Sequence, residues 1–60
     1  MSAAGGKGML TVAGATAPVS VFDLSGRRMA AEERYSFTVA LPAGLYIVNC
    51  GTETVKVLVK

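Results

Sequence analysis

The feature that most constrains this chain is an alternation of apolar and polar residues with a period of two. This period places successive side chains on opposite faces of an extended backbone, so it predicts strands. Leu10 and Val12 alternate with Thr11, and Val19 and Val21 share one face of the next segment, with Phe22 and Leu24 on the other. Three later segments continue the pattern: YSFTVAL (35–41), GLYIVNC (44–50) and ETVKVLVK (53–60).

Two of these segments predict particular positions in a sheet. In residues 35–41, Tyr35 and Phe37 fall on the inward face, together with the apolar positions that follow. Residues 44–50 are apolar on both faces, which predicts a central strand covered on both sides. Only residues 29–34 (MAAEER) could be helical, but an isolated helix under about 12 residues is marginal in water. We therefore expect RRMAA to be the return strand of a hairpin.

About six short strands separated by turn signals predict an all-β fold, either an antiparallel sandwich or an open barrel. We expect residues 1–8 to be a flexible N-terminal segment or linker and residues 9–60 to be the β-module. The Gly-rich start is typical of a cut point in a longer protein. Residues 41–44 either close a hairpin or cross between sheets, and the pattern alone does not decide.

Turn geometry explains several glycines. In Asp23-Leu24-Ser25-Gly26, the two middle residues suit a type I turn, and Gly26 then takes a left-handed conformation. Asp23 can accept hydrogen bonds from the amides of its own turn. Leu41-Pro42-Ala43-Gly44 follows the same logic, and Gly51-Thr52 suits a two-residue hairpin. The stretch VFDLSGRR (21–28) is therefore interpreted as a strand and its turn, with Arg27 on the rim.

Composition argues against catalysis and against a metal or cofactor site. The 60 residues include one cysteine and no histidine, so Ser25 has no base to activate it and soft metal ligands are lacking. Cys50 alternates with apolar residues and is expected to be buried. GGKG lacks the Ser/Thr and the helix of a phosphate-binding loop. The net charge of +2 is too small for the basic stripe of a nucleic-acid-binding domain.

Nothing in the sequence is typical of a membrane span or a signal peptide. The segment VALPAGLYIV is interrupted by Pro42 and Gly44 and falls short of the about 20 apolar residues that a spanning helix needs. MSAAGGKG has no apolar stretch after its lysine.

Three segments together resemble the C-terminal sorting domain of the type IX (Por) secretion system of Bacteroidota. They are VSVFDLSGRRM, LPAGLYIVNCG and TVKVLVK, in this order within residues 19–60. The Pro-Asn-Pro segment that usually opens the family is replaced here by GGKGMLTVAG. By motif position the matching residues are Asp23, Leu24, Gly26 and Arg27 in the first segment, Pro42, Gly44, Leu45 and Tyr46 in the second, and Lys56 and Lys60 in the third.

The resemblance implies an immunoglobulin-like β-sandwich at the end of a larger secreted or cell-surface protein. An outer-membrane translocon would recognise this sandwich, and a sortase-like peptidase would remove it. The matching residues would then act in recognition or in specifying the fold. The first alternative is an accessory structural cap that covers a neighbouring domain and has no sorting role. The second is a small β domain that binds nucleic acid or protein inside the cell, which would need a basic face with exposed aromatic residues.

The last segment is expected to form an edge strand. Lys56 and Lys60 on its outer face are a common protection against edge-to-edge aggregation, and strand addition along this edge is one possible mode of recognition. Because the core is small, a homodimer that shares strand edges is a further alternative.

Overall fold

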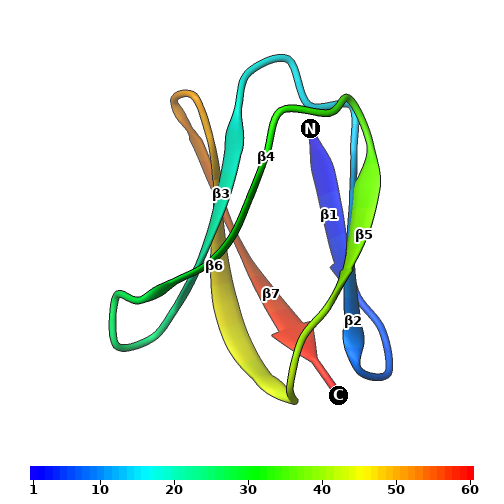
Figure 1. Ribbon diagram of the computed structural model, residues 1–60, viewed down its shortest axis with the longest axis vertical. Helices are drawn as coiled ribbons and strands as arrows, with labels where there is room; N and C mark the ends of the chain where they lie inside the picture. Colours follow the sequence, from blue (N-terminus) through cyan, green and yellow to red (C-terminus); the bar gives the residue numbers. More distant parts are fainter.

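Every segment with a period of two forms a strand in the computed structural model, which describes residues 1–60 (Figure 1). The seven strands are β1 (Ser2–Gly5), β2 (Met9–Ala13), β3 (Val19–Asp23), β4 (Arg28–Glu32), β5 (Phe37–Ala40), β6 (Gly44–Cys50) and β7 (Glu53–Val59). The chain contains no helix, and the return strand expected at RRMAA is formed by β4, which runs from Arg28 to Glu32. No helix that could span a membrane is present.

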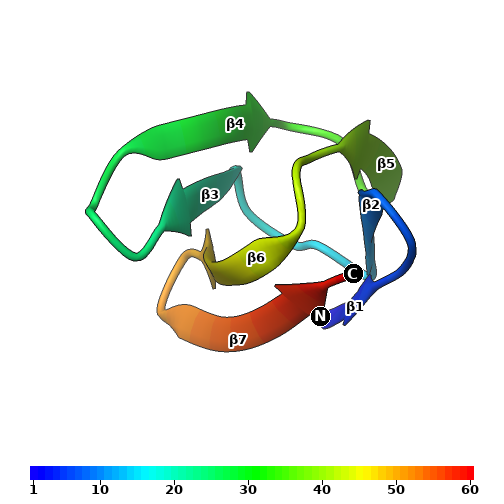
Figure 2. The ribbon, with the colours of Figure 1, turned by 90° about the horizontal axis from the view of Figure 1, so that it is seen from below.

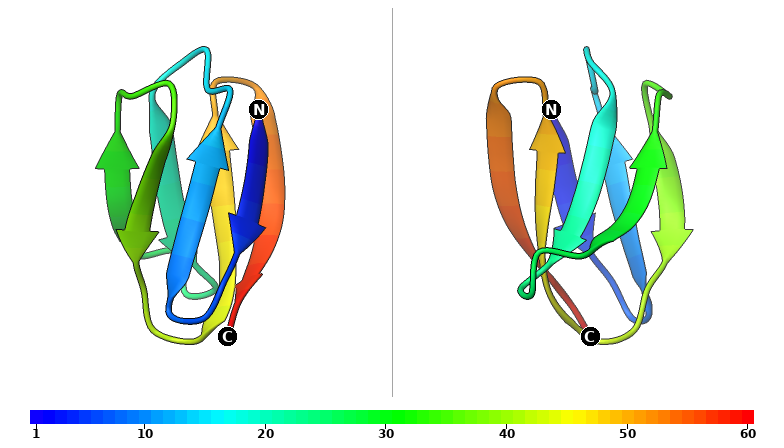
Figure 3. Two further views of the ribbon diagram at one scale, coloured as in Figure 1. Left: turned by 90° about the vertical axis from the view of Figure 1, so that its right-hand side faces the viewer. Right: turned by 60° about the vertical axis from the view of Figure 1, so that its left-hand side comes forward.

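The strands form two antiparallel sheets that face one another (Figures 2 and 3). Sheet I has the order β1-β2-β5, and sheet II has the order β4-β3-β6-β7. In immunoglobulin lettering these orders correspond to A-B-E and C′-C-F-G. The fold class is therefore the predicted immunoglobulin-like β-sandwich. Residues 41–43 cross from sheet I to sheet II, which answers the question that the sequence left open.

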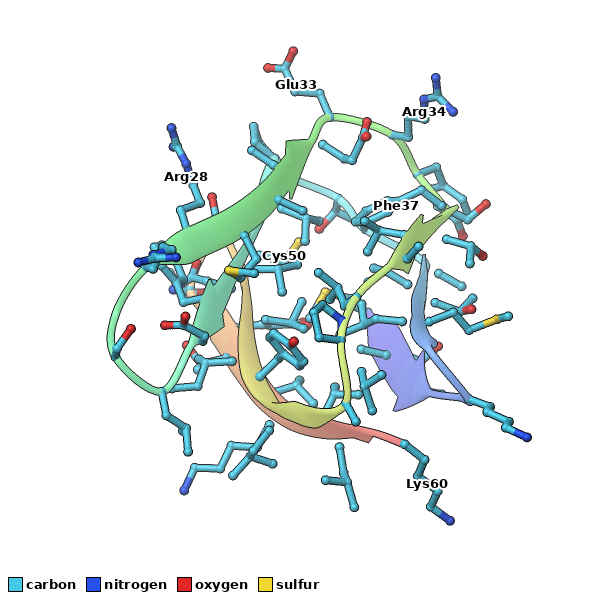
Figure 4. The ribbon with its side chains drawn as sticks, turned by 60° about the horizontal axis from the view of Figure 1, so that its bottom comes forward. Arg28, Glu33, Arg34, Phe37, Cys50 and Lys60 are labelled. Atoms are coloured by element: carbon cyan, nitrogen blue, oxygen red, sulfur yellow. The ribbon has the colours of Figure 1, made fainter.

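The core lies between the sheets and consists of inward positions of the strands together with two residues of the connecting segments, Ala15 and Leu41. Its members are all apolar or weakly polar and leave no buried polar side-chain atom without a partner. They are Leu10, Val12, Ala15, Val19, Val21, Phe37, Leu41, Tyr46, Val48, Cys50, Val57 and Val59. Figure 4 shows Phe37 and Cys50 among them, whereas Arg28, Glu33, Arg34 and Lys60 project outward. The buried position of Cys50 confirms its prediction.

The prediction of a flexible segment over residues 1–8 is wrong for Ser2–Gly5, which form β1. This strand pairs with β2 from Ser2↔Ala13 to Gly5↔Leu10, so the sandwich has seven strands and not about six. SAAG carries no alternation of large apolar residues, and glycine and alanine are poor strand formers. Pairing and packing against its neighbours, and not local propensity, determine this strand.

Two predictions of burial are also wrong. Tyr35 is 71% exposed because β5 starts only at Phe37 and the preceding residues form a bend. Strand β6 lies inside sheet II, but only one of its faces is buried, since no further layer covers Leu45 and Ile47. Apolar residues on both faces of a strand therefore did not mean that both faces were covered.

Candidate recognition surface

The residues that resemble the sorting-domain motifs converge at one end of the sandwich. This lower end comprises the β1–β2 loop (residues 6–8), the β3–β4 turn (23–27), the β5–β6 connection (41–43) and Lys60, all at the bottom of Figure 1. The strand register aligns Asp23 with Tyr46 and aligns Gly44 with Val59. Segments that are far apart in the sequence thus become neighbours.

Asp23 organises the β3–β4 turn through its side chain. Its Oδ1 atom accepts hydrogen bonds from the Ser25 amide (2.9 Å), the Ser25 hydroxyl (2.6 Å) and the Arg27 amide (2.9 Å). The backbone closes the same turn, because the Gly26 amide donates to the Asp23 carbonyl. Gly26 has φ of 89°, the left-handed conformation that was predicted for it.

These hydrogen bonds lower the pKa of Asp23 below its ordinary value of 3.8, with the Ser25 hydroxyl as the largest cause and the Arg27 amide next. Hydrogen bonds to a carboxylate favour its charged form. The carboxylate of Asp23 is therefore occupied by its own turn, and Ser25 is a donor to it. This gives Ser25 a structural role in the turn.

Tyr46 fixes the β5–β6 connection from inside the core. Its side chain is only 4% exposed, and its hydroxyl donates a hydrogen bond of 2.6 Å to the Pro42 carbonyl. A tyrosine near the start of the sixth strand that binds backbone a few residues upstream is the tyrosine corner of immunoglobulin-like sandwiches. The LPAGLY motif thus has a direct structural explanation. Gly44, with φ of 157°, is the first residue of β6 and not the left-handed turn residue that the sequence suggested.

The β1–β2 loop joins the two sheets at this end. The Gly8 amide donates to the Lys60 carbonyl (2.7 Å), and the Lys60 amide donates to the Gly6 carbonyl (3.0 Å). The Leu41 amide donates to the Gly8 carbonyl (3.1 Å). The backbone of Lys60 is therefore already paired, so strand addition at this part of the β7 edge would have to displace the loop.

The ten predicted site residues thus fall into two groups. Asp23, Gly26, Pro42, Gly44 and Tyr46 maintain turns or strand ends within the chain. The others have side chains that are exposed to solvent: Leu24, Arg27, Leu45, Lys56 and Lys60. Nine of the ten lie at or next to the lower end, and Lys56 lies further along β7, opposite Ile47.

Two structural contributors to this region were missed by sequence reasoning. The sequence GGKG was predicted to belong to a flexible segment, yet its backbone connects both sheets. Its high content of glycine was the only feature of the sequence that could have indicated this close backbone contact. Phe22, Ile47 and Leu58 form an exposed face of sheet II beside the predicted residues. The sequence shows that these residues alternate with core residues. It does not show that no further layer covers the face on which they lie.

The lower end exposes the side chains of Leu24, Arg27, Leu45 and Lys60 to solvent. No group of three histidine, cysteine or acidic side chains is placed to hold a metal ion. The thiol of Cys50 is buried and donates to the Ala17 carbonyl at 3.4 Å. Two shallow hollows lie along β3, β4 and the loops at the opposite end.

Comparison with protein-family models, with curated proteins and with solved structures finds no match to this chain.

Proposed function

We propose that this chain is a non-catalytic sorting domain, which directs a larger bacterial protein to secretion or to the cell surface. The observation that carries the proposal is the convergence of the three motif segments at the lower end, where the strand register joins them. Antiparallel pairing of β3, β6 and β7 brings the three segments to the same end of sheet II, so the proposal rests on the motif resemblance together with the single surface that these segments form.

In this proposal the motif residues have different tasks. Asp23, Gly26, Pro42, Gly44 and Tyr46 shape the folded module, because their polar groups or backbone conformations serve its turns and strand ends. Arg27, Lys56 and Lys60 are exposed charges that a translocon or a sortase-like peptidase could contact. The signal is then a folded surface, and the fold must be intact for it to be read.

The second candidate is an accessory cap without a sorting role. The observation that favours it is the uncovered face of sheet II, where Leu58 is 56% exposed. Exposed apolar area of this kind can pack against an adjoining domain.

An export assay tests the proposal. The chain is fused behind a signal peptide and a fluorescent reporter in a bacterium with a working type IX system. Deletion of Thr54–Lys60 is a poor control, because it removes Val57 and Val59 from the core. A better pair is Gly5→Ala, which should disturb the packing of β1 against β7, and Gly6→Ala, whose added methyl group would meet only the flexible side chain of Met9.

A sorting domain predicts reporter at the cell surface or in the medium for the wild type and for Gly6→Ala, and loss of export for Gly5→Ala. Reporter retained in the periplasm with a folded wild-type domain contradicts sorting and supports the cap.

A further inference from the structure

The outer face of sheet II carries an apolar patch that no other part of the chain covers. We define the outer patch as Phe22, Leu45, Ile47 and Leu58. In the strand register Phe22 pairs with Ile47, and Leu45 pairs with Leu58, so the four side chains form two adjacent rows on one face. Leu45 and Leu58 are 36% and 56% exposed, and Phe22 and Ile47 are half-buried. The exposed Leu24 follows at the same end.

Two cations flank this patch. Arg28 pairs with Phe22 on β4, and Lys56 pairs with Ile47 on β7, so the row across the sheet reads Arg28, Phe22, Ile47, Lys56. Neither cation forms an ion pair within the chain. Figure 4 shows Arg28 projecting away from the sandwich.

No carboxylate forms an ion pair with either cation, although Glu32 and Glu33 line a hollow together with Arg28. The remaining outward positions of the paired strands are Ser20, Ala31, Asn49 and Thr54. Glu32 and Glu53 pair with Val19 and Cys50, two core residues, and therefore belong to the opposite face of the sheet. Asp23 is occupied by its own turn.

This charge pattern argues against a second copy of the chain as the occupant. A two-fold axis parallel to the strands would place Arg28 of one copy on Lys56 of the other. A two-fold axis that runs across the strands along the row Arg28, Phe22, Ile47, Lys56 would place each cation of one copy on the same cation of the other. Like charges that face one another across an interface cost several kcal/mol.

We propose that the outer patch binds an acidic amphipathic helix of a partner protein. A helix presents an apolar stripe with polar residues on both sides of it, so leucines can cover Phe22 and Ile47 while glutamates reach Arg28 and Lys56. An extended strand would direct its polar side chains away from the sheet. The inference does not depend on the sorting role.

The test is a titration of the isotope-labelled chain, followed by the NMR shifts of its amides. The probe is a short helical peptide with leucines three and four residues apart and glutamates elsewhere. A second peptide has lysine in place of every glutamate. The proposal predicts shift changes in β3, β6 and β7 around the outer patch with the acidic peptide only, and weaker binding at high salt.

Matched variants separate this surface from general charge attraction. Arg28→Glu and Arg34→Glu change the net charge equally, but Arg34 lies outside the patch and is paired with Glu32 at 3.8 Å. Arg28→Glu should weaken binding about tenfold or more, the loss expected for a charge-assisted contact, while Arg34→Glu should have little effect. Leu58→Ser should weaken binding, whereas Met9→Ser, at an exposed apolar residue of sheet I, should not.

Several results would overturn the proposal. One is that the acidic peptide causes no shift changes at the outer patch, and another is that Arg28→Glu and Arg34→Glu lose equal amounts of affinity for it. Binding of the lysine peptide, or self-association of the chain through this face, would equally contradict the proposal. Binding to vesicles of anionic lipid without binding to the acidic peptide would assign the face to a membrane instead.

Discussion

Single residues at the lower end act by satisfying backbone groups that the turns leave open. Asp23 accepts from the amides of its turn, and Tyr46 donates to the Pro42 carbonyl, so two of the motif positions are explained by hydrogen bonding alone. Gly26 contributes its left-handed conformation, and an added Cβ would meet no atom within 4 Å. A larger residue there would therefore suffer backbone strain and no clash.

Tyr46→Phe removes only the hydroxyl of the tyrosine corner. It should lower the free energy of unfolding by about 1 kcal/mol, because the partly buried Pro42 carbonyl loses its donor. Urea denaturation measures this change. Tyr35→Phe is the matched control and should be silent, since Tyr35 is exposed. Equal stability of the two variants would argue against the corner.

Asp23 should make stability depend on pH in the acid range. Its pKa in the folded state is lowered from 3.8, so the stabilisation by its carboxylate is fully present above this value and is lost as the pH falls through the lowered folded pKa. The Asp23→Asn variant has no carboxyl group at this position that can titrate. The difference in unfolding free energy between wild type and variant should therefore shrink on acidification, and a difference that grows would contradict the assignment.

At the scale of elements, β1 places the edge of sheet I against β7 of sheet II. Gly5 lies so close to β7 that an added Cβ would overlap the backbone carbonyl of Leu58. The β1–β2 loop that follows forms backbone hydrogen bonds with both Lys60 and Leu41. The glycines next to β1 therefore permit close packing of the two sheets at their shared edge.

Gly5→Ala should destabilise the fold, because its methyl group would force β1 away from β7. The expected loss is about 1–3 kcal/mol, as for other overpacked sites. Thermal or urea unfolding measures it, with Gly6→Ala as the control. If Gly5→Ala is as stable as the control, β1 does not pack as described.

Sequence reasoning predicted the elements whose side chains alternate, and it failed where backbone contacts decide. The core faces of β2, β3 and β7 follow from Leu10, Val21 and Val57. The Asp23 turn was also predictable, because its residue types suit only a few conformations. β1 was not, since Ala3 and Gly5 carry no pattern and their strand depends on partners elsewhere in the chain.

The whole molecule combines a small core with an uneven surface. Only 12 of 60 residues are buried, so the stability that the core provides is small. On sheet II, the inner face is filled by core residues, whereas the outer face exposes the outer patch between two cations. One face therefore maintains the fold, and the other is available to a partner.

Amide hydrogen exchange at the lower end tests most directly that the motif residues and residues 1–8 build one folded surface. The amides of Gly8, Leu41 and Lys60 donate to backbone carbonyls that link the loop, the β5–β6 connection and the end of β7. They should exchange as slowly as amides within the edge strands, because opening them requires the sheets to separate. Exchange at the rates of an unfolded peptide would show that the lower end is not assembled and would contradict the account.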